Sequence, residues 1–187
     1  MIQLYKKIFL FCLFIGLNSI AHAQIEVARL QSKNFSATGF GAFLNFGFTV
    51  NPSDVISTEA GLYVFIHDDN HVAETPLLIG YRHLLTDADH GLYVEPLLGY
   101  TFSFTDIHKT DANGNDIYDA NLNPIDIKMQ GATAGLGFGY LFRQSGGSIP
   151  IQFNIGVRYE HVFVSGYSSP NIFSLRISHA FAFGRRD

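Results

Sequence analysis

Seven stretches of the chain alternate between an apolar residue and a small or polar one, so each predicts a β-strand with two unlike faces. In all seven, the apolar face carries no Asp, Glu, Lys or Arg once residues 127–130, which include Lys128, are set aside. A strand of a soluble protein would place charges on the face that meets water. A large, aromatic and charge-free face in every stretch predicts strands that contact lipid, and strands cross a bilayer only as a closed barrel.

The seven predicted strands end at turn-forming residues. They cover residues 39–50, 55–67, 73–85, 92–105, 127–142, 149–163 and 172–184. We expect an eighth strand over residues 25–33, because bacterial barrels made of one chain have an even strand count. Pro96 cannot donate a ladder hydrogen bond, so we expect a bulge there. The predicted fold is an all-β, antiparallel, up-and-down transmembrane β-barrel of eight strands.

The first 23 residues have the pattern of a secretory signal peptide. Lys6 and Lys7 precede an apolar run over residues 8–17, which is shorter than the roughly 20 residues of a membrane-spanning helix. A small-x-small pattern ends at Ala23, where we expect cleavage. We therefore expect residues 1–23 to be removed and residues 24–187 to form one barrel domain.

The expected mature chain has no cysteine, because Cys12 lies within the signal. This excludes disulfides, thiol chemistry and thiolate metal sites from the barrel. Removal of Lys6 and Lys7 takes the formal charge from −4 to −6. A mildly acidic chain without a basic cluster argues against nucleic acid as a partner.

The connections between strands indicate which end of the barrel faces outward. Three of them are short and would share the periplasmic side, namely residues 51–54, 86–91 and 143–148. The outer loops would be residues 68–71, 165–171 and the long polar insertion 106–126, since outer loops are the longer ones in such barrels. We expect an exported monomer in the cell outer membrane. Its expected partners are membrane lipid or lipopolysaccharide, and a protein or ligand at the outer loops.

Small and charged residues share the inward face of the predicted strands. The strand glycines, Gly61 and Gly139 among them, would make room for larger side chains, because eight strands enclose a space that side chains just fill. Three acidic and three basic residues also point inward: Glu59, Arg82, Glu95, Arg158, Glu160 and Arg176. Buried charges need partners, so the pattern predicts a closed, ion-paired interior with a structural role.

Three segments, residues 91–104, 131–142 and 173–183, give the chain its resemblance to a known family. They read GLYVEPLLGYTFSF, GATAGLGFGYLF and FSLRISHAFAF. With the signal and the loop asymmetry, the chain resembles the small outer-membrane barrels of the OmpA/OmpX type, within the "outer membrane protein beta-barrel domain" or porin-family proteins. The resemblance implies eight strands, and we expect no cofactor. Such barrels typically end on an aromatic residue, whereas this chain continues past Phe183 to Asp187.

The long insertion contains a candidate calcium site. Asp111, Asn113, Asn115 and Asp119 place oxygen ligands at alternate positions, as a calcium loop requires. The glycine comes too early for an EF-hand, and Leu122 stands where a bidentate Glu should be. A polar surface loop is the simpler interpretation.

Three other functions are compatible with a barrel. One is a narrow porin-like channel lined by the inward charges. Another is a barrel lipid hydrolase, in which His161 would pair with Ser165 or Ser168, although Glu160 points inward and cannot orient His161. The third is a secreted soluble ligand-binding barrel, which would need the polarity of the two faces reversed. We expect a non-enzymatic barrel with a structural or interaction role.

Overall fold

Strict alternation along the sequence produces eight strands in the computed structural model, which describes residues 20–33, 35–67, 70–86, 90–105, 107–109, 115–144, 151–165 and 168–182. The strands are β1 (Ile20–Gln31), β2 (Ser36–Asn51), β3 (Asp54–His67), β4 (Asn70–Leu84), β5 (Gly91–Thr105), β6 (Gly131–Gln144), β7 (Ile151–Phe163) and β8 (Asn171–Ala182). None of the described residues forms a helix long and apolar enough to cross a membrane.

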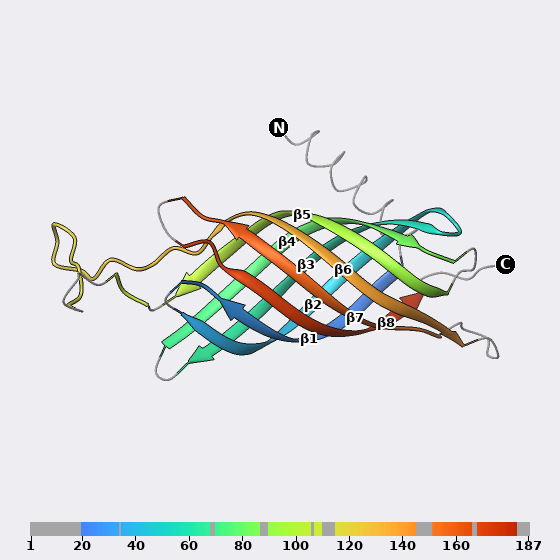
Figure 1. The fold of residues 1–187 in the computed structure, drawn as a ribbon, viewed down its shortest axis with the longest axis horizontal. Helices are drawn as coiled ribbons and strands as arrows, with labels where there is room; N and C mark the ends of the chain where they lie inside the picture. Colours follow the sequence, from blue (N-terminus) through green and yellow to red (C-terminus); the bar gives the residue numbers. More distant parts are fainter. Residues whose placement is uncertain are drawn as a thin grey trace, which may run out of the picture.

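The eight strands form one closed antiparallel barrel in sequence order, because β1 pairs with both β2 and β8 (Figure 1). The predicted eighth strand is therefore confirmed, although β1 begins at Ile20 rather than at residue 25. The cleavage expected after Ala23 would fall within β1 and would leave Gln24–Gln31 paired. That cleavage stays a prediction.

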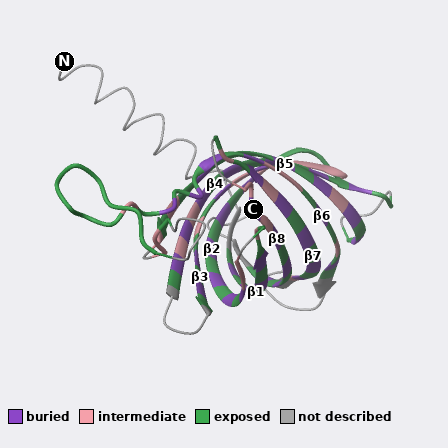
Figure 2. Cartoon of the chain, turned by 60° about the vertical axis from the view of Figure 1, so that its left-hand side comes forward, coloured by how far each residue is buried: buried purple, intermediate pink, exposed green. Residues whose placement is uncertain are grey.

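Burial alternates along every strand, which appears as stripes of buried and exposed residues in Figure 2. In β2, Phe40 and Leu44 on the outward face are 67% and 56% exposed, whereas Phe43 and Asn45 on the inward face are each 3% exposed. The predicted assignment of inward and outward faces is confirmed. The barrel thus presents an apolar exterior, and its interior contains buried polar and charged side chains beside apolar ones.

The bulge predicted at Pro96 is absent, and this prediction was wrong. In the β4–β5 ladder, Gly80 pairs with Leu97 and His83 pairs with Val94, so the register is the same on both sides of the proline. Pro96 lies where two successive pairs are missing from this ladder. The β4–β5 ladder therefore has a local gap at Pro96, which has no N–H to donate. On its other side, β5 remains paired at this position, where Pro96 lies opposite Leu136 of β6.

The start of β6 also differs from the prediction. Residues 127–130 alternate like a strand, but β6 begins at Gly131. Ile127 and Met129 are 6% and 1% exposed because their side chains turn into the barrel mouth and pack among apolar residues there. Sequence alternation alone could not separate a strand that faces lipid from a segment that fills the mouth.

Before this segment, residues 107–109 and 115–126 form an arm that projects from one end of the barrel (Figures 1 and 2). Backbone hydrogen bonds hold its segments together, among them Lys109 N–H to Ile125 O and Ile125 N–H to Ile117 O. We call this end of the barrel the arm end. The opposite end, which carries the Asn51–Asp54 connection, is called the turn end.

Several predicted features lie outside the described residues. These are residues 1–19 of the signal, residues 68–69, 87–89, 106, 110–114, 145–150 and 166–167 of the loops, and Phe183 with the residues after it.

Candidate functional site in the barrel interior

The lumen is apolar at the arm end. A cluster of buried side chains from strands and loops fills it, and we call this cluster the plug. The plug consists of Ala28, Leu30, Ala37, Phe43, Tyr63, Phe65, Val72, Ile127, Met129, Val162 and Ile172. Phe35, Ile107 and Val164 from the loops pack against it. The barrel mouth at this end is therefore closed by side chains rather than open to water.

A smaller apolar cluster lies toward the turn end and is formed by Leu84, Tyr93 and Leu141. Between it and the plug lies a layer of charged side chains, which we call the ionic layer. Its eight members are buried, with exposures between 0% and 7%. They are Glu26, Glu59, Glu74, Glu95, Glu160, Arg82, Arg158 and Arg176.

One half of the ionic layer is organised around Arg158. Its Nη1 lies 3.6 Å from Glu26 Oε1 and 3.2 Å from Glu160 Oε1, and its Nη2 donates to Glu59 Oε2 at 2.7 Å. The Tyr63 hydroxyl donates to Glu26 Oε2 at 2.5 Å. Three carboxylates therefore surround one guanidinium, which leaves this half with an excess of negative charge.

The other half is organised around Glu95. Arg82 Nη2 donates to Glu95 Oε1 at 3.1 Å, Arg176 Nη2 donates to Oε2, and the Ser57 hydroxyl donates to Oε1 at 3.0 Å. Arg176 also donates to the Tyr93 hydroxyl at 2.9 Å. Here two guanidinium groups share one carboxylate, so the excess charge is positive.

All six charged residues predicted to point inward lie in the ionic layer, but the predicted balance of three acids and three arginines was incomplete. The structure adds Glu26 and Glu74, which makes five glutamates and three arginines among the described buried residues. Glu74 shares its parity with Arg82 on β4, so strict alternation could have identified it. Glu26 lies on the strand with the weakest pattern.

Inward glycines make room for large rings, as predicted. A Cβ placed on Gly61 would lie 1.9 Å from Cδ1 of Phe43, and a Cβ on Gly139 would lie 2.3 Å from the hydroxyl of Tyr93. Both distances are far shorter than any van der Waals contact. Each ring therefore lies over the neighbouring strand at a position that only glycine leaves free, since Phe43 pairs with Gly61 and Tyr93 pairs with Gly139.

The pair proposed for a lipid hydrolase is not assembled among the described residues. His161 Nδ1 lies 2.8 Å from Asn171 Oδ1, which also accepts from the Tyr159 hydroxyl at 2.7 Å. The Ser168 hydroxyl accepts from the backbone N–H of Lys33. No hydrogen bond joins His161 to Ser165 or Ser168, and Glu160 points into the lumen as expected.

The calcium-loop candidate is only partly described, since Asp111 and Asn113 lie outside the described residues. Asp119 Oδ1 accepts the backbone N–H groups of Asn121 and Asn123 at 2.8 and 2.9 Å. Bonds from the Asn123 and Asn121 backbones hold the pKa of Asp119 below its usual value. Asp119 thus closes a turn. No group of three or more His, Cys, Asp or Glu side chains in the described part of the chain is arranged to hold a metal ion.

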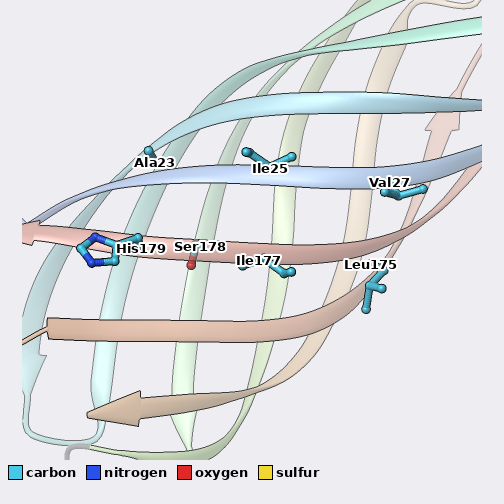
Figure 3. A pocket seen from close by; sticks show the side chains of 7 residues that line it. All are labelled: Ala23, Ile25, Val27, Leu175, Ile177, Ser178 and His179. Atoms are coloured by element: carbon cyan, nitrogen blue, oxygen red, sulfur yellow. The ribbon is translucent and has the colours of Figure 1, made fainter. Parts of the chain in front are cut away.

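The exterior carries a shallow apolar hollow across the seam between β1 and β8 (Figure 3). Ile25 and Val27 line it from β1, and Leu175 and Ile177 line it from β8, with His179 at one end. Its lining continues the apolar exterior of the barrel. Nothing in the hollow distinguishes one apolar occupant from another, so it is not assigned as a specific site.

Comparison with solved structures identifies the fold. Neisserial surface protein A is similar over 87% of this chain and 96% of its own, with 14% identity and a TM-score of 0.66. Ail, the attachment invasion locus protein of Yersinia pestis, is similar over 87% and 97%, with 12% identity and a TM-score of 0.55. No protein-family model and no curated protein matches the sequence. The chain therefore has the fold of the small eight-stranded outer-membrane barrels, and at this identity the likeness shows the fold alone.

Proposed function

We propose that the protein is an integral outer-membrane barrel with a closed lumen, and that it acts through the arm outside the membrane. The observation that carries this proposal is the filled interior. The plug, the ionic layer and the cluster at Leu84 occupy the lumen in succession. A barrel of about eight strands has room for its side chains and little else, so the activity belongs to the loops.

The exterior supports the membrane location. Large apolar side chains such as Ile79, Leu98 and Phe104 are 62%, 67% and 68% exposed. Exposed apolar surface of this extent is unfavourable in water and marks a lipid or protein contact. The reverse arrangement, with a polar exterior and an apolar cavity, would be needed for a secreted ligand-binding barrel.

The arm supports an interaction role. Its tip presents Ile117, Tyr118 and Leu122, which are 39%, 54% and 82% exposed. Leu122 has a φ of 63°, a left-handed conformation that glycine or asparagine adopts at far lower cost. A strained residue that presents an apolar side chain to solvent is consistent with a contact made outside the barrel.

Cysteine labelling on intact cells tests both the location and the orientation. The only native cysteine, Cys12, lies in the predicted signal, so a single Asn121→Cys variant carries one reporter at the arm tip. We expect a membrane-impermeant maleimide to label it on intact cells. The matched control, Ser53→Cys at the turn end, should be labelled only after the outer membrane is permeabilised.

Labelling of both variants on intact cells, or recovery of the protein in the soluble periplasmic fraction, would contradict the proposed location. Labelling of Ser53→Cys alone would reverse the orientation and place the arm in the periplasm.

A further inference from the structure

The charges of the ionic layer do not balance. Five buried glutamates face three buried arginines in the part of the chain that the structure describes, an excess of two negative charges. The low-dielectric surroundings of a membrane barrel make such an excess costly, and buried charges are normally paired or coordinate metal ions. The excess lies at one place, because the half around Glu95 has the opposite sign.

Glu74 carries the clearest sign of a missing partner. Its side chain is 0% exposed, and neither carboxylate oxygen has a hydrogen-bond partner among the described residues. On β5 the residue opposite it is Ser103, whose hydroxyl oxygen is also buried and unpartnered. A carboxylate and a hydroxyl thus face the same part of the lumen with their oxygens unused.

A second carboxylate faces this region. Tyr63 lies directly opposite Glu74 in the β3–β4 ladder, and its hydroxyl lies 3.5 Å from Glu160 Oε1. The other oxygen of Glu160, Oε2, is buried without a partner. Arg158, the cation that pairs with Glu160, is already shared among Glu26, Glu59 and Glu160.

We propose that the lumen binds one divalent cation of the Mg²⁺ or Ca²⁺ type between Glu74 and Glu160, with the Ser103 hydroxyl as a further ligand. Both ions take oxygen ligands, and Mg²⁺ in particular is held by one or two carboxylates while it keeps several waters. One divalent ion cancels the excess of two charges. The proposed site is separate from the calcium-loop candidate in the arm. It follows from the fold and does not rest on the proposed function.

Metal analysis of the whole refolded chain tests the proposal directly. The chain is refolded in detergent with MgCl₂ or CaCl₂, passed through a desalting column, and its bound metal is measured. We expect one ion per chain in the wild type and none in Glu74→Gln, which removes the charge and keeps the shape. Asp116→Asn, a change to a carboxylate on the arm, is the matched control and should retain the ion.

Unfolding in urea gives a second readout at fixed pH and ionic strength. A ligand that binds only the folded state lowers the unfolding equilibrium constant by about tenfold when it is present at ten times its dissociation constant. We expect this response to Mg²⁺ or Ca²⁺ in the wild type, a weaker response in Ser103→Ala, and none in Glu74→Gln. Addition of EDTA should reverse the stabilisation of the wild type.

Ser103→Ala preserves every charge, so it keeps the test decisive if Glu74→Gln fails to fold. Equal metal content in the wild type and both variants would overturn the proposal, because the ions would then belong to the surface or the detergent. Absence of metal from the wild type, with stability that follows pH alone, would also overturn it and would assign the excess charge to bound protons.

Discussion

At the scale of single residues, the interior depends on glycines that stand opposite large rings. Gly61 lies against Phe43, whose ring would be 1.9 Å from an added Cβ. We expect Gly61→Ala to lower the free energy of unfolding by about 1–3 kcal/mol, the usual cost of overpacking a filled core. Urea unfolding of the refolded barrel measures this. Ala60→Val, the neighbouring change on the exposed face, is the control and should leave the midpoint unchanged.

Arg158 holds one half of the ionic layer together, because three glutamates lie within 4.0 Å of its guanidinium. We expect Arg158→Leu to cost about 3–5 kcal/mol, since it leaves buried carboxylates without their cation. The gel shift between folded and heat-unfolded barrel should then occur at a lower temperature. Adding Glu59→Leu to Arg158→Leu should recover part of the loss, and a gel shift unchanged in Arg158→Leu would contradict the ion-paired interior.

These residues show which features of the interior can be predicted from the sequence. Alternation alone assigns Glu59, Arg158 and Gly61 to the lumen, because side chains on a strand repeat every second residue. It does not say which carboxylate meets which guanidinium, since β3 and β7 supply Glu59 and Arg158 from opposite parts of the barrel. Such pairs depend on strand tilt and stagger, which are properties of the closed barrel.

At the scale of elements, the arm is organised by the turn at its tip. Asp119 accepts two backbone N–H groups through Oδ1, and its own N–H donates to Asn123 O. Hydrogen bonds to a charged acceptor are stronger than those to a neutral acceptor. We expect Asp119→Ala to speed amide hydrogen exchange at Asn121 and Asn123 by about tenfold or more. The unfolding midpoint of the barrel should not change, because the turn lies outside it.

Leu122→Gly is the complementary variant of the same element. It removes the exposed side chain and relieves the left-handed backbone at Leu122, so exchange at the tip should stay slow. Faster exchange in this variant would show that the Leu122 side chain, rather than the Asp119 turn, orders the tip.

The arm also marks the limit of prediction at this scale. Sequence alternation predicts the strands because both faces of each are chemically distinct. The segment at Ile127 and Met129 has the same alternation, yet it fills the barrel mouth. Periodicity predicts that one face of a segment is buried. It does not predict whether that face packs in the lumen as part of a strand or fills the barrel mouth.

At the scale of the whole molecule, three layers of side chains fill the lumen one after another from the arm end to the turn end. The plug closes the arm end, and the ionic layer fills the space between the plug and the cluster of Leu84, Tyr93 and Leu141. We therefore expect no stepwise conductance from the refolded protein in a planar bilayer, because an eight-stranded barrel filled in this way leaves no aqueous path. A refolded open porin serves as the positive control for insertion and detection.

The layers also predict how the barrel responds when one of them is weakened. Truncation of the plug in Ile127→Ala with Met129→Ala opens space at the arm end, but the ionic layer still fills the lumen below it. We expect each truncation to lower the free energy of unfolding by about 2–5 kcal/mol where neighbouring side chains do not repack into the cavity. The double variant should remain non-conducting. Conductance in the double variant but not in the wild type would make the plug the only barrier, and conductance in both would contradict a closed lumen.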